Sequence, residues 1–449
     1  MKFLEELAAR RRFGMKPGLD AIRGTCAALG DPQKSLVAIH VAGTNGKGAV
    51  CAMLDAALRA NGLRVGRYTS PHLVKLNERF FLDGAPIGDD ALSAAAEKVA
   101  KIAPDDLTFF EALTAVAFLV YADAKVDYAV LETGLGGRLD ATNVCVPELC
   151  VITRIGLDHC DWLGDTVEKI ASEKAGIIKP HVPVVLGENL PEVRAVVEAR
   201  AKEVGAPFFY APDVASAADV PRDFPLAGTF NRENAVTALA ALKVLWSYRV
   251  ELGRLGSGSA GRDGVPSTSN MHEWGVELAK GFSNVVWPGR FQRVENFIID
   301  GAHNPPAAHA LAEALRELNF SEPLALIAGF CGDKDVGDVL SILAPFVKKG
   351  YAVRTNNPRS LSAEETAEKM RAAGIDAVAA PSLAAAIGSA SSAPRALICG
   401  SLFLAGEALV EFGAYPWPNP RFDAAELLRG AAGSGRSMSG TNGRSTAGS

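Results

Sequence analysis

A glycine-rich segment near the N-terminus has the residue types that bind a phosphate group. It reads Ile39-His40-Val41-Ala42-Gly43-Thr44-Asn45-Gly46-Lys47-Gly48-Ala49. Its glycines let successive backbone N–H groups point inward, and the start of a following helix adds partial positive charge. Lys47 would bring a point charge to the β- and γ-phosphates of a nucleotide. The strict Walker pattern fails, because Gly48 and Ala49 follow the lysine where Ser or Thr would bind magnesium. Taken alone, the segment also fits a glycine-rich turn of an α/β fold, and any magnesium hydroxyl must come from elsewhere.

Three other residues have side chains that suit a divalent metal. They are Ser70, Glu132 and His159, each at or just after the end of a short apolar segment that predicts a strand. The ends of parallel strands meet at one edge of a sheet, so these side chains can converge there. Oxygen, carboxylate and imidazole ligands suit Mg²⁺, although histidine is unusual for so hard a cation. Alone, Glu132 fits a structural carboxylate equally well, and His159 fits a structural histidine better.

Alternation of short β-branched runs with longer Ala/Leu-rich runs predicts the elements that position these residues. In the first half we expect strands at Val37–Val41, Val65–Tyr68, Tyr128–Leu131, Leu149–Thr153 and Val182–Leu186. Helices are predicted at Ala49–Ala60, Phe110–Ala122, Leu190–Val204 and Asn231–Leu245. A second series has strands at Phe297–Asp300, Leu324–Ala328, Tyr351–Arg354, Ala377–Ala379 and Ala396–Cys399, with helices at Ala307–Leu318 and Ala363–Ala373. Such alternation is typical of parallel sheets covered by helices on both faces.

The expected fold is therefore α/β, with a P-loop-type, mostly parallel sheet domain followed by a smaller Rossmann-like C-terminal domain. We expect the first domain over residues 1–289 and the second over 290–425. Proline and glycine in Trp287-Pro288-Gly289-Arg290 predict the hinge. Gly/Ser-rich composition predicts a disordered insertion at 253–270 and a disordered tail at 433–449.

Bulk composition excludes several classes of protein. The 449-residue chain is 48% hydrophobic and 22% charged with a net charge of −5, which argues against a nucleic-acid partner. No window of about 18 apolar residues predicts a membrane span, and Met1–Phe13 predicts an amphipathic helix, not a secretory signal. Seven scattered cysteines indicate reduced, buried thiols. We expect a cytoplasmic protein without membrane or nucleic-acid partners.

Six segments in order resemble the Mur-type ligases, in the version found in folylpolyglutamate synthases/dihydrofolate synthases. Beside the Ala42–Gly48 loop they are Tyr68-Thr69-Ser70-Pro71-His72-Leu73, Leu131–Asn143 (LETGLGGRLDATN), Leu157–Gly164 (LDHCDWLG), Glu173-Lys174-Ala175-Gly176-Ile177, and Pro288-Gly289-Arg290-Phe291 with Asp300-Gly301-Ala302-His303-Asn304-Pro305. The resemblance spans roughly residues 10 to 415. Any one segment is weak, but six in this order form a specific signal.

The resemblance implies roles for many of these residues. ATP would be bound by Gly43, Thr44, Asn45, Gly46, Lys47, Gly48, Asn234, Arg290 and Asp300. One Mg²⁺ would be held by Ser70, Glu132 and His159, and a second by Lys174 after carbamylation by CO₂. Sequence chemistry alone would make Lys174 a surface lysine. His303 resembles the family's glutamate-site or catalytic histidine, while Phe230 stands where the family commonly has histidine.

The acid substrate is also implied by the resemblance. The segment containing Thr108, Phe110 and Glu111 resembles the family's pterin-contacting segment, and Arg138, Asp140 and Gly14–Gly18 match other stretches of that pocket. For Phe110 alone, a place in a helix core is an equally good interpretation.

Together these features predict an ATP-dependent ligase that adds L-glutamate to dihydropteroate, to reduced folate (poly)glutamates or to both, through an acyl phosphate. Its partners would be small molecules, and the family resemblance favours a monomer. One alternative is another Mur-type amino-acid ligase acting on a cell-wall or storage-polymer precursor. Only about 35 residues precede the first strand, too few for the domain that binds UDP-linked substrates. A nucleotide-dependent switch is the other alternative, but it would not need the second α/β half.

Overall fold

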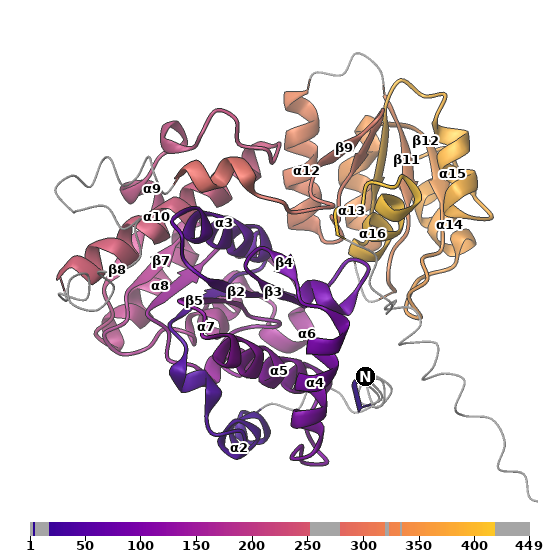
Figure 1. Cartoon of the computed structure of the whole chain (residues 1–449). Helices are drawn as coiled ribbons and strands as arrows, with labels where there is room; N and C mark the ends of the chain where they lie inside the picture. The colour runs from indigo at the N-terminus through magenta and orange to yellow at the C-terminus, as the bar shows by residue number, and fades with distance from the viewer. Residues whose placement is uncertain (1–2, 5–17, 252–278, 319–322, 333–334, 418–449) are drawn as a thin grey trace, which may run out of the picture.

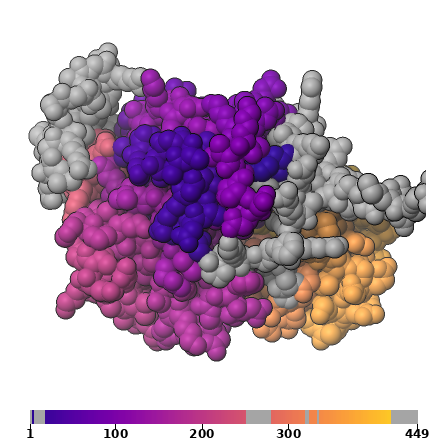
Figure 2. Space-filling view, turned by 90° about the horizontal axis from the view of Figure 1, so that it is seen from below, coloured from indigo at the N-terminus to yellow at the C-terminus, as the bar shows by residue number. Residues whose placement is uncertain are grey.

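Two α/β domains, each built on its own sheet, form the computed structural model (Figure 1). It describes residues 3–4, 18–251, 279–318, 323–332 and 335–417. The predicted insertion at 253–270, the predicted tail at 433–449 and nearly all of the predicted N-terminal helix lie outside the described residues. Figure 2 shows the second domain as an orange-to-yellow lobe beside the larger body formed by the earlier residues.

The first domain contains an eight-stranded sheet in the order β4-β3-β2-β5-β1-β6-β7-β8. Its strands are β1 (Ala38–Ala42), β2 (Val65–Tyr68), β3 (Phe80–Leu82), β4 (Ala85–Pro86), β5 (Tyr128–Glu132), β6 (Leu149–Ile152), β7 (Val184–Leu186) and β8 (Phe208–Tyr210). All neighbours pair in parallel except β2–β3 and β3–β4. The carboxyl ends of β1, β2, β5 and β6 therefore lie along one edge of the sheet.

Helices cover both faces of this sheet because successive strand residues point to opposite sides. The helices are α2 (Asp20–Ala28), α3 (Lys47–Ala60), α4 (Asp89–Ala100), α5 (Phe109–Ala124), α6 (Cys160–Leu163), α7 (Val167–Ala175), α8 (Pro191–Glu203), α9 (Ala211–Val214) and α10 (Thr229–Glu251). Val41 and Val130 pack under α3 and α10 on one face. Leu131 packs against α2, α4 and α5 on the other, and Ile152 against α7 and α8.

The second domain contains a six-stranded sheet in the order β13-β12-β11-β14-β10-β9. Its strands are β9 (Gln292–Val294), β10 (Phe297–Ile299), β11 (Leu324–Ala328), β12 (Val347–Ala352), β13 (Ala377–Ala379) and β14 (Ala396–Cys399). Only β9, at the edge, is antiparallel to its neighbour. The helices are α12 (Pro305–Glu317), α13 (Val336–Leu343), α14 (Ala363–Ala372), α15 (Leu383–Ala390) and α16 (Leu402–Glu411). The first three cover one face of the sheet, and α15 and α16 cover the other.

The predicted fold class is confirmed, and most predicted elements lie within two residues of their observed bounds. The hairpin of β3 and β4 at the edge of the first sheet was not predicted. The prediction of buried thiols is wrong for Cys160, which is exposed, and holds for the other six cysteines, which are buried. No helix in the described part of the chain combines the length and apolarity that crossing a membrane requires.

Candidate active site

A cleft between the two domains collects most of the residues singled out from the sequence. The first domain contributes the Gly43–Ala49 loop, Ser70, Glu132, His159, Lys174 and Asn234 to its lining, and the second contributes Arg290, Asp300 and His303. The space between the lining atoms measures about 1520 Å³, part of it open to solvent. The cleft is therefore open to solvent and is lined by side chains of both domains.

The glycine-rich loop connects β1 to α3, as a phosphate-binding loop must. Its backbone is held by the segment that follows β6, because Thr44 N and Asn45 N both donate to the Arg154 carbonyl, at 2.9 and 3.2 Å. Gly46 has a φ of +87°, and a Cβ there would collide with the Asn234 side chain. Lys47 begins α3 and its Nζ donates to the Thr44 carbonyl at 3.1 Å. These contacts fix the loop so that its glycines and Lys47 line the cleft.

The structure explains why position 48, which is Ser or Thr in the Walker pattern, is glycine in this chain. A Cβ at Gly48 would collide with the indole ring of Trp287, coming within 2.8 Å of Cη2 and 3.3 Å of Cε2. Trp287 lies in the predicted hinge and lines the cleft. A serine or threonine at this position would displace that ring, so the packing of Trp287 excludes the usual magnesium-binding hydroxyl.

Lys174 is buried, with 4% of its surface exposed. Its Nζ donates to the Gly43 carbonyl at 2.7 Å, which ties α7 to the phosphate loop. Burial, together with the positive charge of Lys47, lowers the pKa of Lys174 from 10.5 to about 7. The surface position suggested by sequence chemistry alone is wrong, because β1 and the loop fold over the end of α7.

Glu132 and Ser70 lie together at the carboxyl ends of β5 and β2. Ser70 N donates to Glu132 Oε2 at 2.9 Å, and the carboxylate is only 4% exposed. Burial raises the pKa of Glu132, while Lys47, the Ser70 donor and Arg290 oppose that rise. His159 lines the same cleft from a more exposed position, in left-handed backbone conformation (φ +54°) before α6.

These residues fit a magnesium–nucleotide complex better than a metal cage made by protein alone. Among the described residues, no three His, Cys, Asp or Glu side chains gather closely enough to hold a metal ion. Mg²⁺ usually takes one or two carboxylates and completes its shell with waters and substrate phosphates. A single buried carboxylate with a serine beside a phosphate loop matches that pattern.

The second domain presents an arginine, a carboxylate and a histidine to the cleft. Asp300 directly follows β10, and its two oxygens accept from Phe291 N and Ala302 N, both at 2.8 Å. Burial raises the pKa of Asp300, and the positive charge of Arg290 opposes that rise. His303 is oriented by a 2.8 Å contact between Nδ1 and the Gly301 carbonyl.

A contact across the cleft was not assigned from the sequence. Asn304, the N-cap of α12, donates through Nδ2 to Asp158 Oδ2 at 2.8 Å and accepts from Ala307 N at 2.9 Å. Asn304 and Asn45 of the phosphate loop also approach each other, at 3.4 and 3.5 Å. The signal that could have found the cap is an asparagine directly before two prolines at a helix start.

The five residues predicted to bind the acid substrate do not line this cleft in the structure. Thr108 and Glu111 form a capping box at the start of α5, with Glu111 Oε2 accepting from Thr108 N at 2.8 Å. Asp140 accepts from four donors of the 134–142 segment, and Arg138 pairs with Glu173 at 2.8 Å. Phe110 packs against Gly134, which lines the cleft together with Leu135 and Gly136. Phe110 and Asp140 therefore lie directly behind the Gly134–Gly136 wall of the cleft.

Comparison with known proteins agrees with this arrangement. The family model of the Mur ligase middle domain matches residues 41–202, and that of the Mur ligase, glutamate ligase domain matches residues 289–402. The dihydrofolate synthase/folylpolyglutamate synthase of Bacillus subtilis (strain 168) is 33% identical over 386 residues, covering 79% of this chain and 85% of that protein. The chain belongs to the folylpolyglutamate synthase/dihydrofolate synthase family of Mur ligases.

Other family members show the same similarity over nearly the whole length. The Escherichia coli (strain K12) dihydrofolate synthase/folylpolyglutamate synthase is 33% identical over 417 residues, covering 89% of this chain and 92% of that protein. The solved structure of E. coli FolC in complex with DHPP and ADP has a TM-score of 0.79 and 31% identity, covering 92% of this chain and 97% of that one. A Yersinia pestis family member complexed with AMPPNP and Mn ion has a TM-score of 0.78 and 29% identity, with coverage of 92% and 97%. The resemblance of the six segments and the expected class, an ATP-dependent ligase, are therefore confirmed.

Proposed function

We propose that this enzyme uses ATP to join L-glutamate to a pterin acid, either dihydropteroate or a reduced folate (poly)glutamate, through an acyl phosphate. The observation that carries the proposal is the single cleft in which the Lys47 loop and Glu132 face Arg290 and His303 of the second domain. In such a site, groups of the first domain would bind the nucleotide and the metal, and groups of the second domain would contact the nucleotide and glutamate. The monomeric state and the cytoplasmic location stay predictions from the sequence.

ATP would lie along the phosphate loop, with Gly43, Thr44, Asn45, Gly46, Lys47 and Gly48 around its phosphates and Asn234 toward its base. The two Asp300 oxygens accept from backbone donors, and the negative charge of Asp300 opposes the lowering of the pKa of Arg290 by burial, so Asp300 would keep Arg290 charged beside the nucleotide. Ser70, Glu132 and His159 would hold a divalent metal. When bound, the metal screens the repulsion between the γ-phosphate and the attacking carboxylate.

Phosphorylation activates the acid because a carboxylate oxygen is a poor leaving group at neutral pH. The carboxylate of the pterin acid attacks the γ-phosphate, ADP leaves, and Lys47 and Arg290 stabilise charge on the transferred group. The α-amine of glutamate then attacks the acyl carbon and inorganic phosphate leaves. His303, with Nδ1 fixed by the Gly301 carbonyl, is the candidate base that takes the amine proton.

Lys174 is proposed to become a second metal ligand by carbamylation. A neutral amine attacks CO₂, forms an N–C bond and releases one proton, which leaves a carbamate with carboxylate-like oxygens. With a pKa of about 7, a large fraction of Lys174 is neutral at physiological pH. Exposure to ¹³C-labelled CO₂ should give a carbamate NMR signal that Lys174→Met lacks. A wild-type spectrum without that signal at pH 8 would contradict carbamylation.

The pterin ring is proposed to bind where Gly134–Gly136 separates the cleft from Phe110. Asp140 holds that wall in shape by accepting from Gly134 N and Leu135 N, and Thr108, Glu111 and Arg138 would complete the pocket. Entry of the ring would require Phe110 to move from Gly134 or to stack on the incoming ring. Phe110→Ala should therefore raise the KM for the pterin acid and leave the KM for ATP unchanged.

The direct test is ADP release by the purified full-length protein with MgATP and L-glutamate, with and without dihydropteroate or tetrahydrofolate. We expect ADP only when glutamate and a pterin acid are both present, and the preferred acid distinguishes the two substrate classes. ADP release that does not depend on a pterin acid, or full activity in Lys47→Ala, would refute the proposal.

A further inference from the structure

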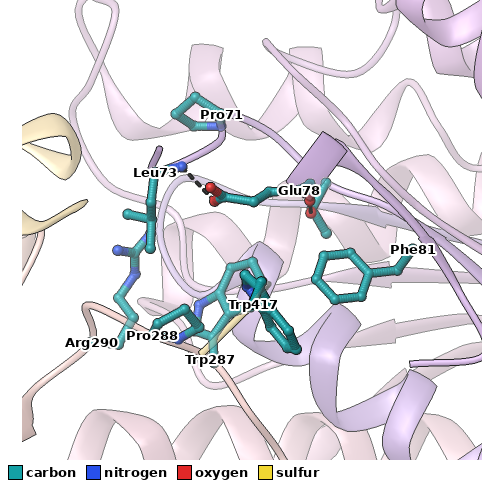
Figure 3. Close-up of a pocket in the computed structure, with 9 residues that line it drawn as sticks. Pro71, Leu73, Glu78, Phe81, Trp287, Pro288, Arg290 and Trp417 are labelled. Atoms are coloured by element: carbon teal, nitrogen blue, oxygen red, sulfur yellow. Dashed lines mark hydrogen bonds between the residues drawn. The ribbon is translucent and has the colours of Figure 1, made fainter. Parts of the chain in front are cut away.

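The chain after α16 returns to the first domain and contacts a loop next to the candidate metal site. This segment, residues 414–417, is here called the C-terminal strap, and Pro71–Arg79 is called the Ser70 loop because it begins directly after Ser70. The strap contacts the first domain through Tyr415, which meets Glu78, and Trp417, whose ring lies 5.1 Å from that of Phe81. Figure 3 shows Glu78 between Leu73 and the aromatic rings of Phe81 and Trp417.

Glu78 holds the Ser70 loop in its conformation. Its Oε2 accepts from Leu73 N at 2.7 Å, and its Oε1 accepts from Val74 N at 2.8 Å and Lys75 N at 2.6 Å. The phenolic O–H of Tyr415 donates to the same Oε1 at 2.6 Å. The carboxylate is 7% exposed, so a hydrogen bond to it is charge-assisted and poorly screened by water. A second-domain residue thus completes the hydrogen-bonding of a first-domain loop.

The Ser70 loop is also clamped between the domains by packing. Leu73 packs with the second-domain core beneath α16. Gly406 of α16 lies so close that a Cβ there would come within 2.6 Å of the Leu73 carbonyl. At the other end of the loop, Ser70 N donates to Glu132 Oε2. Any shift of the loop relative to the second domain therefore acts on the Ser70–Glu132 pair.

We propose that Tyr415 is a positioning residue for metal binding, acting through Glu78 and the Ser70 loop on Ser70 and Glu132. The C-terminal strap thereby makes the geometry of the metal site depend on the position of the second domain. This inference rests on the proposed function, because it takes Ser70 and Glu132 as metal ligands.

Binding of Mn²⁺ to the full-length protein tests the inference without requiring turnover. Free Mn²⁺ would be followed by electron paramagnetic resonance in the presence of saturating AMPPNP, for wild type and Tyr415→Phe. Loss of one hydrogen bond to a buried carboxylate should weaken Mn²⁺ binding about tenfold. The affinity for AMPPNP without metal should stay unchanged, since Tyr415 does not line the nucleotide cleft.

Tyr351→Phe is the matched control. It removes another second-domain hydroxyl, which donates to the Ser389 carbonyl at an exposed site, and should leave Mn²⁺ binding unchanged. Glu78→Gln should weaken Mn²⁺ binding more than Tyr415→Phe, because the amide has only one accepting oxygen and its NH₂ group would face loop N–H groups that now donate to the second carboxylate oxygen.

Mn²⁺ affinity of Tyr415→Phe within about twofold of wild type would overturn the inference, even if the variant unfolds at a lower temperature. If wild type bound no Mn²⁺ in the presence of AMPPNP, the proposed function itself would fail. Should Glu78→Gln not fold, the comparison of Tyr415→Phe with Tyr351→Phe still decides the question.

Discussion

Restoring the Walker serine should damage this enzyme. In the structure, a Cβ at position 48 overlaps the Trp287 indole, so Gly48→Ser must displace this packed ring. Inserting atoms into a packed site costs roughly 1–3 kcal/mol. Removing a glycine from a helix recovers about 0.5 kcal/mol. The difference predicts a net loss of about 0.5–2.5 kcal/mol in the free energy of unfolding, together with weaker nucleotide binding.

Gly337→Ser is the matched control for this prediction. Gly337 is the second residue of α13, as Gly48 is the second residue of α3, but a Cβ there meets nothing within 4 Å. It should change the free energy of unfolding by no more than about 0.5 kcal/mol. Both variants would be compared by urea unfolding and by calorimetric titration with AMPPNP. Equal stability and equal nucleotide affinity of the two variants would refute the role assigned to Trp287.

Three further predictions concern single residues. Between pH 7 and 8.5 the free energy of unfolding of the protein, in CO₂-free buffer, should rise more steeply with pH than that of Lys174→Met. The reason is that the unfolded lysine keeps its proton up to about 10.5 while the folded one loses it near 7; parallel urea-unfolding curves would contradict this. Glu132→Gln should lower ligase activity by about 10²-fold with no loss of stability, since burial opposes the carboxylate charge; a large drop in unfolding temperature would indicate a structural carboxylate instead. Asn304→Ala should cost about 1 kcal/mol as a lost helix cap and also raise the KM for ATP, because Asn304 contacts Asn45 of the phosphate loop, whereas Ser362→Ala, which removes the cap of α14, should affect stability alone.

Local sequence patterns predicted the parts of the fold that depend on local physics. The strands at 324–328 and 396–399 have their predicted bounds, because buried parallel strands are apolar throughout and end at turn residues. The strands Val65–Tyr68 and 377–379 also have their predicted bounds, although the first contains Arg67 and the second is largely exposed. The β3–β4 hairpin was missed although Asp83-Gly84, both with positive φ, is a typical hairpin turn. Its strands have three and two residues, too short to show a period.

The candidate site was predictable only as far as residue types and motif order allow. The residue types and motif positions of the loop glycines, Lys47 and Glu132 were enough to predict their chemistry, and these residues line one cleft in the structure. The burial of Lys174 and the contact of Trp287 with Gly48 depend on how distant segments pack, and no local pattern encodes that. The hydrogen bond between Glu78 and Tyr415 could not be predicted either, because Tyr415 lies 337 residues further along the chain.

Transfer of an oxygen label from the pterin acid to phosphate tests directly whether the enzyme ligates glutamate through an acyl phosphate. The pterin acid would carry ¹⁸O in its carboxylate and react with MgATP and L-glutamate, and the products would be analysed by mass spectrometry. If the enzyme forms an acyl phosphate, the acid gains one glutamate residue and one labelled oxygen appears in the inorganic phosphate released. A glutamylated product formed without label in the phosphate would contradict the acyl-phosphate route, and the absence of any glutamylated product would contradict the assigned function.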